Sequence, residues 1–193
     1  MTENIDPRPS YDRALDWAQT LVEGVRPGQL GDPTPCPEFD VRALLGHLVA
    51  TVTRARAIGE GRPPFAVPSL VEGVADDAWP AALAEAVAAM RPVWADDALL
   101  DKEVQVPWGT VPGRAALWGY VNEALVHGWD LAVATGQDPE ADADVAEAAL
   151  AGAREKIPAG MRGEGVPFDA VVEPAPGAGP TEQLANWSGH RRR

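Results

Sequence analysis

Four long stretches of this sequence repeat apolar residues every three or four positions, and each stretch is bounded by proline or glycine. This spacing gives a helix one apolar face, and that face has to be buried against other helices. We therefore predict an all-α protein, a four-helix bundle whose helices pack side by side around one core. The predicted helices run from Ser10 to Val25, from Asp40 to Gly59, from Asp77 to Trp94 and from Arg114 to Thr135.

The rest of the chain is predicted to add smaller elements to this bundle. Residues 102–113 alternate apolar and other side chains around prolines, which is compatible with either a short hairpin or an extended loop. An additional helix is expected from Asp142 and a short last helix from Thr181. We therefore divide the chain into a bundle domain at 1–159 and a Gly/Pro-rich, loop-rich tail at 160–193, packed on the bundle or frayed from it.

The charge of the chain excludes some classes of partner. The 193 residues include 16 Lys and Arg against 29 Asp and Glu, a formal net charge of −13. A surface of this sign repels nucleic acid phosphates and anionic lipid headgroups, so no nucleic acid partner is expected. No apolar run is long enough to span a membrane, and the first residues lack the basic-then-apolar order of a secretory signal. These features predict a cytoplasmic protein without membrane contact.

Two histidines lie inside predicted helices rather than in loops. His47 belongs to the second helix, and His127 belongs to the fourth, with Glu123 four positions before it and Asp130 three positions after it. At 3.6 residues per turn, Glu123, His127 and Asp130 share one side of their helix, at the edge of its apolar stripe. His47 lies at the corresponding edge of the second helix. These polar side chains are therefore predicted to meet in a cleft between two helices.

Two imidazoles and a carboxylate that converge are suitable ligands for Zn²⁺ or a similar divalent metal. The third histidine, His190, falls in the tail, which makes Glu123 the third ligand beside His47 and His127. Three protein ligands leave a coordination position open, as in catalytic zinc sites. Asp130 would then orient a ligand imidazole. On spacing alone, the same residues are also compatible with a surface Glu–His pair and a half-buried histidine.

Two blocks of sequence around these residues resemble a known family. Residues 34–48, TPCPEFDVRALLGHL, are similar to the start of the second helix in the mycothiol-dependent maleylpyruvate isomerase N-terminal family, part of the DinB-like metalloenzyme group. Residues 123–132, EALVHGWDLA, followed by Thr135 and Gly136, are similar to the fourth helix of that family. The order and separation of the blocks also agree, and the likeness covers roughly residues 10–150.

The resemblance implies a DinB-like four-helix bundle with a divalent metal, usually zinc. Carried over residue by residue, the ligands are His47 of the second helix and the pair Glu123 and His127 of the fourth. The resemblance also implies a low-molecular-weight thiol, mycothiol, as cosubstrate. The expected partners are then small molecules: this thiol and a small electrophilic substrate.

One departure from the family affects the expected reaction. The maleylpyruvate isomerase itself carries an additional C-terminal domain that contributes to catalysis, whereas only a Gly/Pro-rich tail follows the fifth helix here. We therefore expect a thiol transferase or isomerase-like enzyme, in which a metal-activated thiolate attacks a small electrophile. A metal-dependent hydrolase with metal-bound water and a non-catalytic DinB-like protein that binds a small ligand remain alternatives.

Three further residues are candidates for the same site. Tyr120 lies one turn before Glu123 and could donate a proton or a hydrogen bond, although tyrosines of this kind are also common at the edge of a core. Cys36, the single cysteine, lies between prolines and is interpreted as a small buried side chain rather than a nucleophile. Trp129, next to the ligand turn, could form a wall of the pocket.

Overall fold

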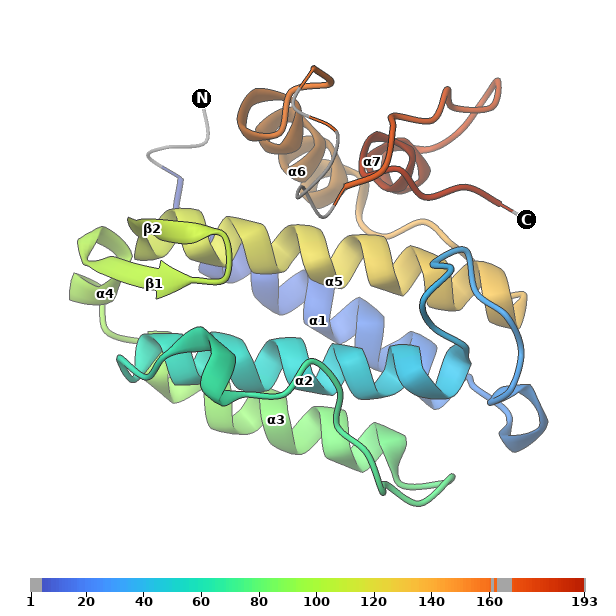
Figure 1. Cartoon of the computed structure of the whole chain (residues 1–193), viewed down its shortest axis with the longest axis horizontal. Helices are drawn as coiled ribbons and strands as arrows, with labels where there is room; N and C mark the ends of the chain where they lie inside the picture. Colours follow the sequence, from blue (N-terminus) through green and yellow to red (C-terminus); the bar gives the residue numbers. More distant parts are fainter. Residues whose placement is uncertain (1–4, 161, 163–167, 193) are drawn as a thin grey trace.

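A computed structural model describes residues 5–160, 162 and 168–192 and confirms the all-α, four-helix bundle fold. The bundle consists of α1 (Arg8–Glu23), α2 (Val41–Gly59), α3 (Trp79–Trp94) and α5 (Gly113–Thr135) (Figure 1). Helix α1 packs on α3 and α5, and α2 packs on the same two helices, so that each bundle helix contacts two others. The core lies between them, and every bundle helix contributes a leucine that is at most 2% exposed: Leu15, Leu45, Leu83 and Leu117.

Local chemistry sets where these helices begin and end. Helix α2 begins after Asp40, whose carboxylate accepts a hydrogen bond from the backbone N–H of Ala43 at 2.8 Å, as the sequence predicts. Helix α5 ends at Gly136, which adopts the left-handed conformation with φ 71°. Helix α1 begins at Arg8, two residues before the predicted Ser10, because the first turn of a helix tolerates the proline at position 9.

Residues 102–113, for which the sequence left two alternatives open, form a hairpin. A short helix, α4 (Ala98–Asp101), leads into β1 (Glu103–Val106), which pairs antiparallel with β2 (Gly109–Pro112). The hairpin lies beside the first turns of α5 (Figure 1). Two single-turn 3₁₀ segments, η2 (Pro27–Gln29) and η3 (Pro64–Ala66), lie in the connections before and after α2.

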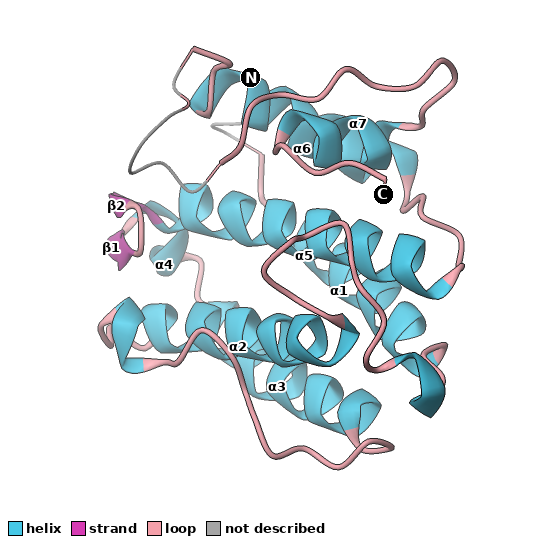
Figure 2. Ribbon diagram, turned by 45° about the vertical axis from the view of Figure 1, so that its right-hand side comes forward, coloured by secondary structure: helices cyan, strands magenta, loops and turns pink. Residues whose placement is uncertain are grey.

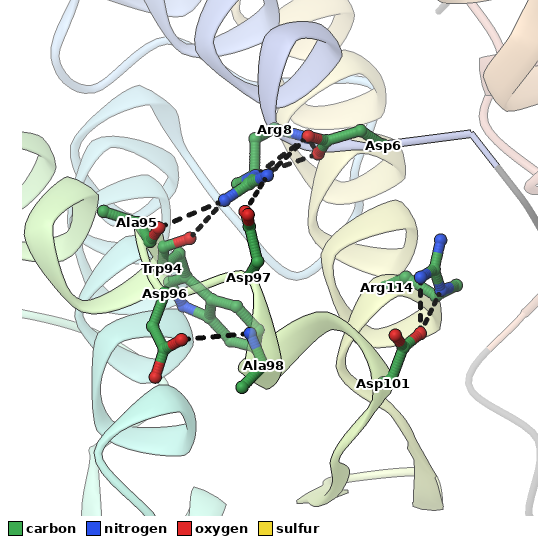
Figure 3. Close-up of polar contacts among 9 residues, drawn as sticks. All are labelled: Asp6, Arg8, Trp94, Ala95, Asp96, Asp97, Ala98, Asp101 and Arg114. Carbon is green, nitrogen blue, oxygen red and sulfur yellow. Dashed lines mark hydrogen bonds and ion pairs between the residues drawn. The ribbon is translucent and has the colours of Figure 1, made fainter.

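A polar network fixes the end of the bundle where α1 begins (Figure 3). Arg8 donates hydrogen bonds to Asp6 and Asp97, each at 2.7 Å, and also to backbone carbonyls at the end of α3. Arg114 at the start of α5 pairs with Asp101 of α4. These contacts connect the start of α1 to the turn between α3 and α4, and the start of α5 to the end of α4. Because most of these groups are solvent-exposed, we expect them to orient the helix ends and to contribute little to the free energy of unfolding.

Two further helices cover the side of α5 that faces away from α2 and α3 (Figure 2). Helix α6 (Ala143–Lys156) and helix α7 (Pro180–Trp187) pack on each other and on α5. Consequently the C-terminal half of α5 is enclosed on several sides, and residues 124–132 are all buried. The predicted loop at 160–179 falls partly outside the described residues. In the described part of the chain, every helix is too short or too polar to cross a membrane.

Candidate metal centre

The side chains of His47, Glu123 and His127 converge between α2 and α5. Glu123 Oε2 lies 3.5 Å from His47 Nε2 and 3.7 Å from His127 Nε2, and one donor atom from each residue falls within 4.8 Å of the other two. The two imidazole rings meet edge to face, with centroids 4.7 Å apart. The structure therefore brings together the three residues that the sequence selects, although His47 is more than 70 positions from the other two along the chain.

The donor set fits a divalent metal of the zinc type in chemistry and in spacing. Zinc bonds to nitrogen and oxygen of 2.0–2.1 Å in a tetrahedral site place neighbouring ligand atoms about 3.3 Å apart. The measured separations of 3.5 and 3.7 Å from Glu123 to the two histidines are close to this value. Two imidazoles and one carboxylate would leave a fourth position open for a substrate atom. Their role as metal ligands stays a prediction.

Each histidine is held by a hydrogen bond to its other ring nitrogen. His47 Nδ1 lies 3.0 Å from the backbone carbonyl oxygen of Ser69, and His127 Nδ1 lies 3.1 Å from Asp130 Oδ2. A carbonyl oxygen can only accept, so His47 Nδ1 carries the proton and its Nε2 has a free lone pair. Asp130 imposes the same tautomer on His127. Both Nε2 atoms therefore have a lone pair available for a cation. Asp130 orients the His127 imidazole in the way that the sequence predicts.

A glycine beside His47 allows the loop that carries Ser69 to approach α2. The backbone N–H of Val71 donates to the carbonyl oxygen of Gly46 at 3.1 Å. A Cβ atom on Gly46 would lie 2.4 Å from the carbonyl oxygen of Val71, far inside contact distance. Only glycine therefore permits this close approach, which also places the Ser69 carbonyl against His47.

We expect Gly46→Ala to lower the affinity for zinc by about tenfold, because the displaced loop no longer holds the His47 ring. Alanine favours helix over glycine by up to about 1 kcal/mol, so the loss is not expected to come from unwinding of α2. The measurement is competition with a chelator of known affinity. Gly31→Ala is the matched control, since a Cβ there meets nothing within 4 Å. Equal zinc affinity for both variants would contradict this account of the loop.

Asp130 has a second histidine partner that the sequence analysis placed in the tail. Asp130 is fully buried, and His190 Nδ1 lies 2.9 Å from each of its carboxylate oxygens. The rings of His190 and His127 meet edge to face with centroids 5.7 Å apart. No local pattern pointed to this contact, because His190 follows α7 and is 60 positions from Asp130.

Burial and the neighbouring histidines have opposite effects on the pKa values of the two acids of the site, Glu123 and Asp130. Burial would raise the pKa of Glu123, but its interactions with His47 and His127 outweigh that effect and hold the pKa below its usual value. Burial would likewise raise the pKa of Asp130, and its hydrogen bonds from His127 and His190 lower it instead. Both carboxyl groups are therefore ionised at neutral pH, as a metal ligand and an imidazole acceptor require.

The converging residues line a cavity of about 200 Å³. Its walls come from five parts of the chain: the connection before α2, the helices α2 and α5, Phe168 in the loop before α7, and the segment after α7. Apolar side chains occupy several positions of the wall, and Phe39 stacks at 4.9 Å from the His47 ring. The other lining residues are Cys36, Glu38, Asn122, Glu123, Val126, His127, Ser188 and His190. A second cavity of equal volume, between Arg8 and Trp94, contains no comparable set of ligand atoms among the described residues.

The remaining candidates from the sequence lie in different places. Cys36 is buried, as expected, and is also part of the cavity wall. Tyr120 and Trp129 are not among the described residues of this wall. Tyr120 lies one turn before Glu123 on α5, where its ring is 5.9 Å from Trp108 of the hairpin, and burial raises its pKa. Trp129 is fully buried with Arg192 over its ring. The geometry thus gives no support for Tyr120 as a proton donor or for Trp129 as a wall.

Comparison with known proteins agrees with this architecture. Uncharacterized proteins from two strains of Mycobacterium tuberculosis are each 33% identical over 187 residues, covering 96% of this chain and 98% of theirs. The crystal structure of the mycothiol-dependent maleylpyruvate isomerase shares the fold, with a TM-score of 0.53, 17% identity and coverage of 68% of this chain. A histidine-to-alanine mutant of that enzyme gives a TM-score of 0.55 at 15% identity.

This chain spans 62% of the length of the isomerase structures it matches. The sequence model of the mycothiol maleylpyruvate isomerase N-terminal domain matches residues 11–132, which include most of α1, all of α2 and α3, and nearly all of α5. That match takes in all three converging residues and ends just after Asp130. The chain belongs to the mycothiol maleylpyruvate isomerase N-terminal domain family.

Proposed function

We propose that this protein is a metal-dependent enzyme that uses a low-molecular-weight thiol of the mycothiol type as cosubstrate. Its reaction would be thiol transfer to a small electrophile, or an isomerisation that proceeds through addition of the thiol. The observation that carries the proposal is the arrangement of His47, Glu123 and His127, whose donor atoms face one point from two helices. Membership of the family supports the thiol as cosubstrate.

His47, Glu123 and His127 would hold the metal, most readily Zn²⁺. When bound, such a cation lowers the pKa of a thiol that reaches it and so makes a thiolate available at neutral pH. The negative charge of Glu123 would offset part of the cation's charge. Asp130 and the Ser69 carbonyl would keep both imidazoles in the required tautomer.

The cavity wall indicates what kind of substrate fits. A volume of about 200 Å³ accommodates a small molecule and not a polymer. Phe39, Val126 and Phe168 would exclude water from one side of the reacting atoms. The formal net charge of −13 disfavours nucleic acid as a partner.

Metal analysis combined with a thiol screen tests the proposal. The protein is loaded with zinc, dialysed and analysed for metal, and we expect about one equivalent per chain. Consumption of small electrophiles is then measured with and without added cysteinyl thiols. Turnover that requires the thiol supports the proposal. Retention of no zinc contradicts it, and turnover that is indifferent to the thiol indicates a hydrolase instead.

A further inference from the structure

The segment after α7 reaches the candidate metal centre from outside the matched domain. The family match ends at residue 132, whereas Phe168, Ser188 and His190 line the same cavity as the three converging residues. Of these, His190 makes the most specific contact, because it hydrogen-bonds both oxygens of the buried Asp130 at 2.9 Å. His190 therefore lies outside the matched domain, and its contact with Asp130 comes from the C-terminal segment.

His190 is not placed as a fourth ligand. The group of donor atoms that lie within 4.8 Å of one another contains His47, Glu123 and His127, and among the described residues it does not extend to His190. The His190 ring instead contacts the edge of the His127 ring, and its Nδ1 is directed at Asp130. An effect of His190 on the metal would therefore pass through Asp130.

The Asp130 carboxylate needs both of its histidine partners to have a fixed orientation. The terminal torsion of an aspartate is broad and roughly two-fold, so a single hydrogen bond from His127 leaves rotation of the carboxylate weakly restrained. His190 bonds both oxygens and so fixes the carboxylate plane. Because Asp130 is fully buried, water cannot take over this task.

The position of His190 is itself determined by contacts of its own segment. Its backbone N–H donates to the carbonyl oxygen of Ala185 at 2.9 Å, and its carbonyl accepts from Asn186 Nδ2 at 2.9 Å. Leu184 and Ala185 are fully buried against the rest of the protein. The histidine therefore approaches Asp130 from a well-packed helix end.

We infer that His190 is a positioning residue, which fixes Asp130 and through it the metal-binding orientation of His127. The inference rests on the proposed metal site. Linked equilibria are reciprocal. If docking of the C-terminal segment raises the affinity for the metal, then metal binding stabilises that docking by the same factor.

Two variants of equal shape test this role in the full-length chain. His190→Leu removes the donor, while His190→Asn keeps an N–H group close to the place of Nδ1. We expect zinc affinity, measured by chelator competition, to fall about tenfold in His190→Leu and to be largely restored in His190→Asn. Arg192→Gln is the matched control, because it breaks the 2.6 Å ion pair with Glu182 in the same segment without touching Asp130. Its zinc affinity should stay within about twofold of the unchanged protein.

Hydrogen exchange of the unchanged protein gives an independent readout that does not depend on folding of a variant. We expect zinc to slow amide exchange in residues 180–190. Equal zinc affinity of the Leu and Asn variants, or exchange in that segment that is indifferent to zinc, would overturn the inference. If the unchanged protein binds no zinc, the proposed function fails first. Zinc binding that does not respond to His190 leaves the proposed function intact and removes only the positioning role.

Discussion

Replacement of His127 by alanine is expected to reduce zinc affinity by more than 100-fold. Loss of an outer partner of a ligand imidazole typically costs about 10–100-fold, and removal of the ligand itself must cost more. Glu123 and His47 would remain, but two ligands leave the cation held mainly by water. The measurement is competition with a chelator, supported by the metal content after dialysis.

The control for this experiment is Glu38→Gln. Glu38 lines the same cavity, yet it is not part of the group of donor atoms that lie within 4.8 Å of one another. Its zinc affinity should therefore stay within about twofold of the unchanged protein. The thermal unfolding of metal-free His127→Ala should be recorded alongside, so that loss of the fold is separated from loss of the ligand. A properly folded His127→Ala protein that still binds zinc tightly would show that the three residues do not form the site.

Asp130→Asn is expected to have the second largest effect, a loss of about 10–100-fold in zinc affinity. His190 Nδ1 lies 2.9 Å from both carboxylate oxygens and His127 Nδ1 lies 3.1 Å from one of them, so the NH₂ group of an asparagine faces an imidazole N–H whichever way its amide is turned. When the NH₂ group faces His127, that ring has to move its proton to Nε2, and in that tautomer Nε2 has no lone pair for a metal. Size is unchanged in this substitution, so any loss reports hydrogen bonding and charge.

The same substitution should also destabilise the metal-free protein. A buried hydrogen bond to a charged group contributes about 1.5–3 kcal/mol, and Asp130→Asn weakens two of them. We therefore expect a loss of at least about 2 kcal/mol in the free energy of unfolding, measured with urea. Asp76→Asn, which removes a surface carboxylate paired with Arg42, is the control and should change neither quantity appreciably. Zinc affinity like that of the control would contradict the orienting role of Asp130.

The helices of this protein could be predicted because their signals are local. Apolar residues at helical spacing, together with Asp40 as a cap and Gly136 as a stop, placed the bundle helices within about two residues of their positions. The pairing of the hairpin strands could not be decided, because residues 102–113 are too short and too rich in proline for periodicity to distinguish a strand from a loop.

Part of the candidate site could also be predicted from spacing. The one-turn separation puts Glu123 and His127 on the same side of α5 whatever the rest of the chain does. The same reasoning placed Asp130 at the edge of the apolar stripe of its helix. It is completely buried, because α6 and α7 pack over the side of α5 that looks polar in the sequence. Tyr120 lies one turn before Glu123 on α5, where its ring is close to Trp108 of the hairpin, and its role as a proton donor stays a prediction.

The sequence by itself determined the helices and the side of each helix on which its candidate ligand residues lie, since both follow from backbone geometry repeated every 3.6 residues. The tertiary structure alone decided that His47 faces Glu123, that the Ser69 carbonyl and Asp130 orient the two imidazoles, and that His190 returns to Asp130. These contacts join segments that are distant along the chain or depend on a loop without periodicity. Their energies arise only when packing brings the segments together, so no local pattern encodes them.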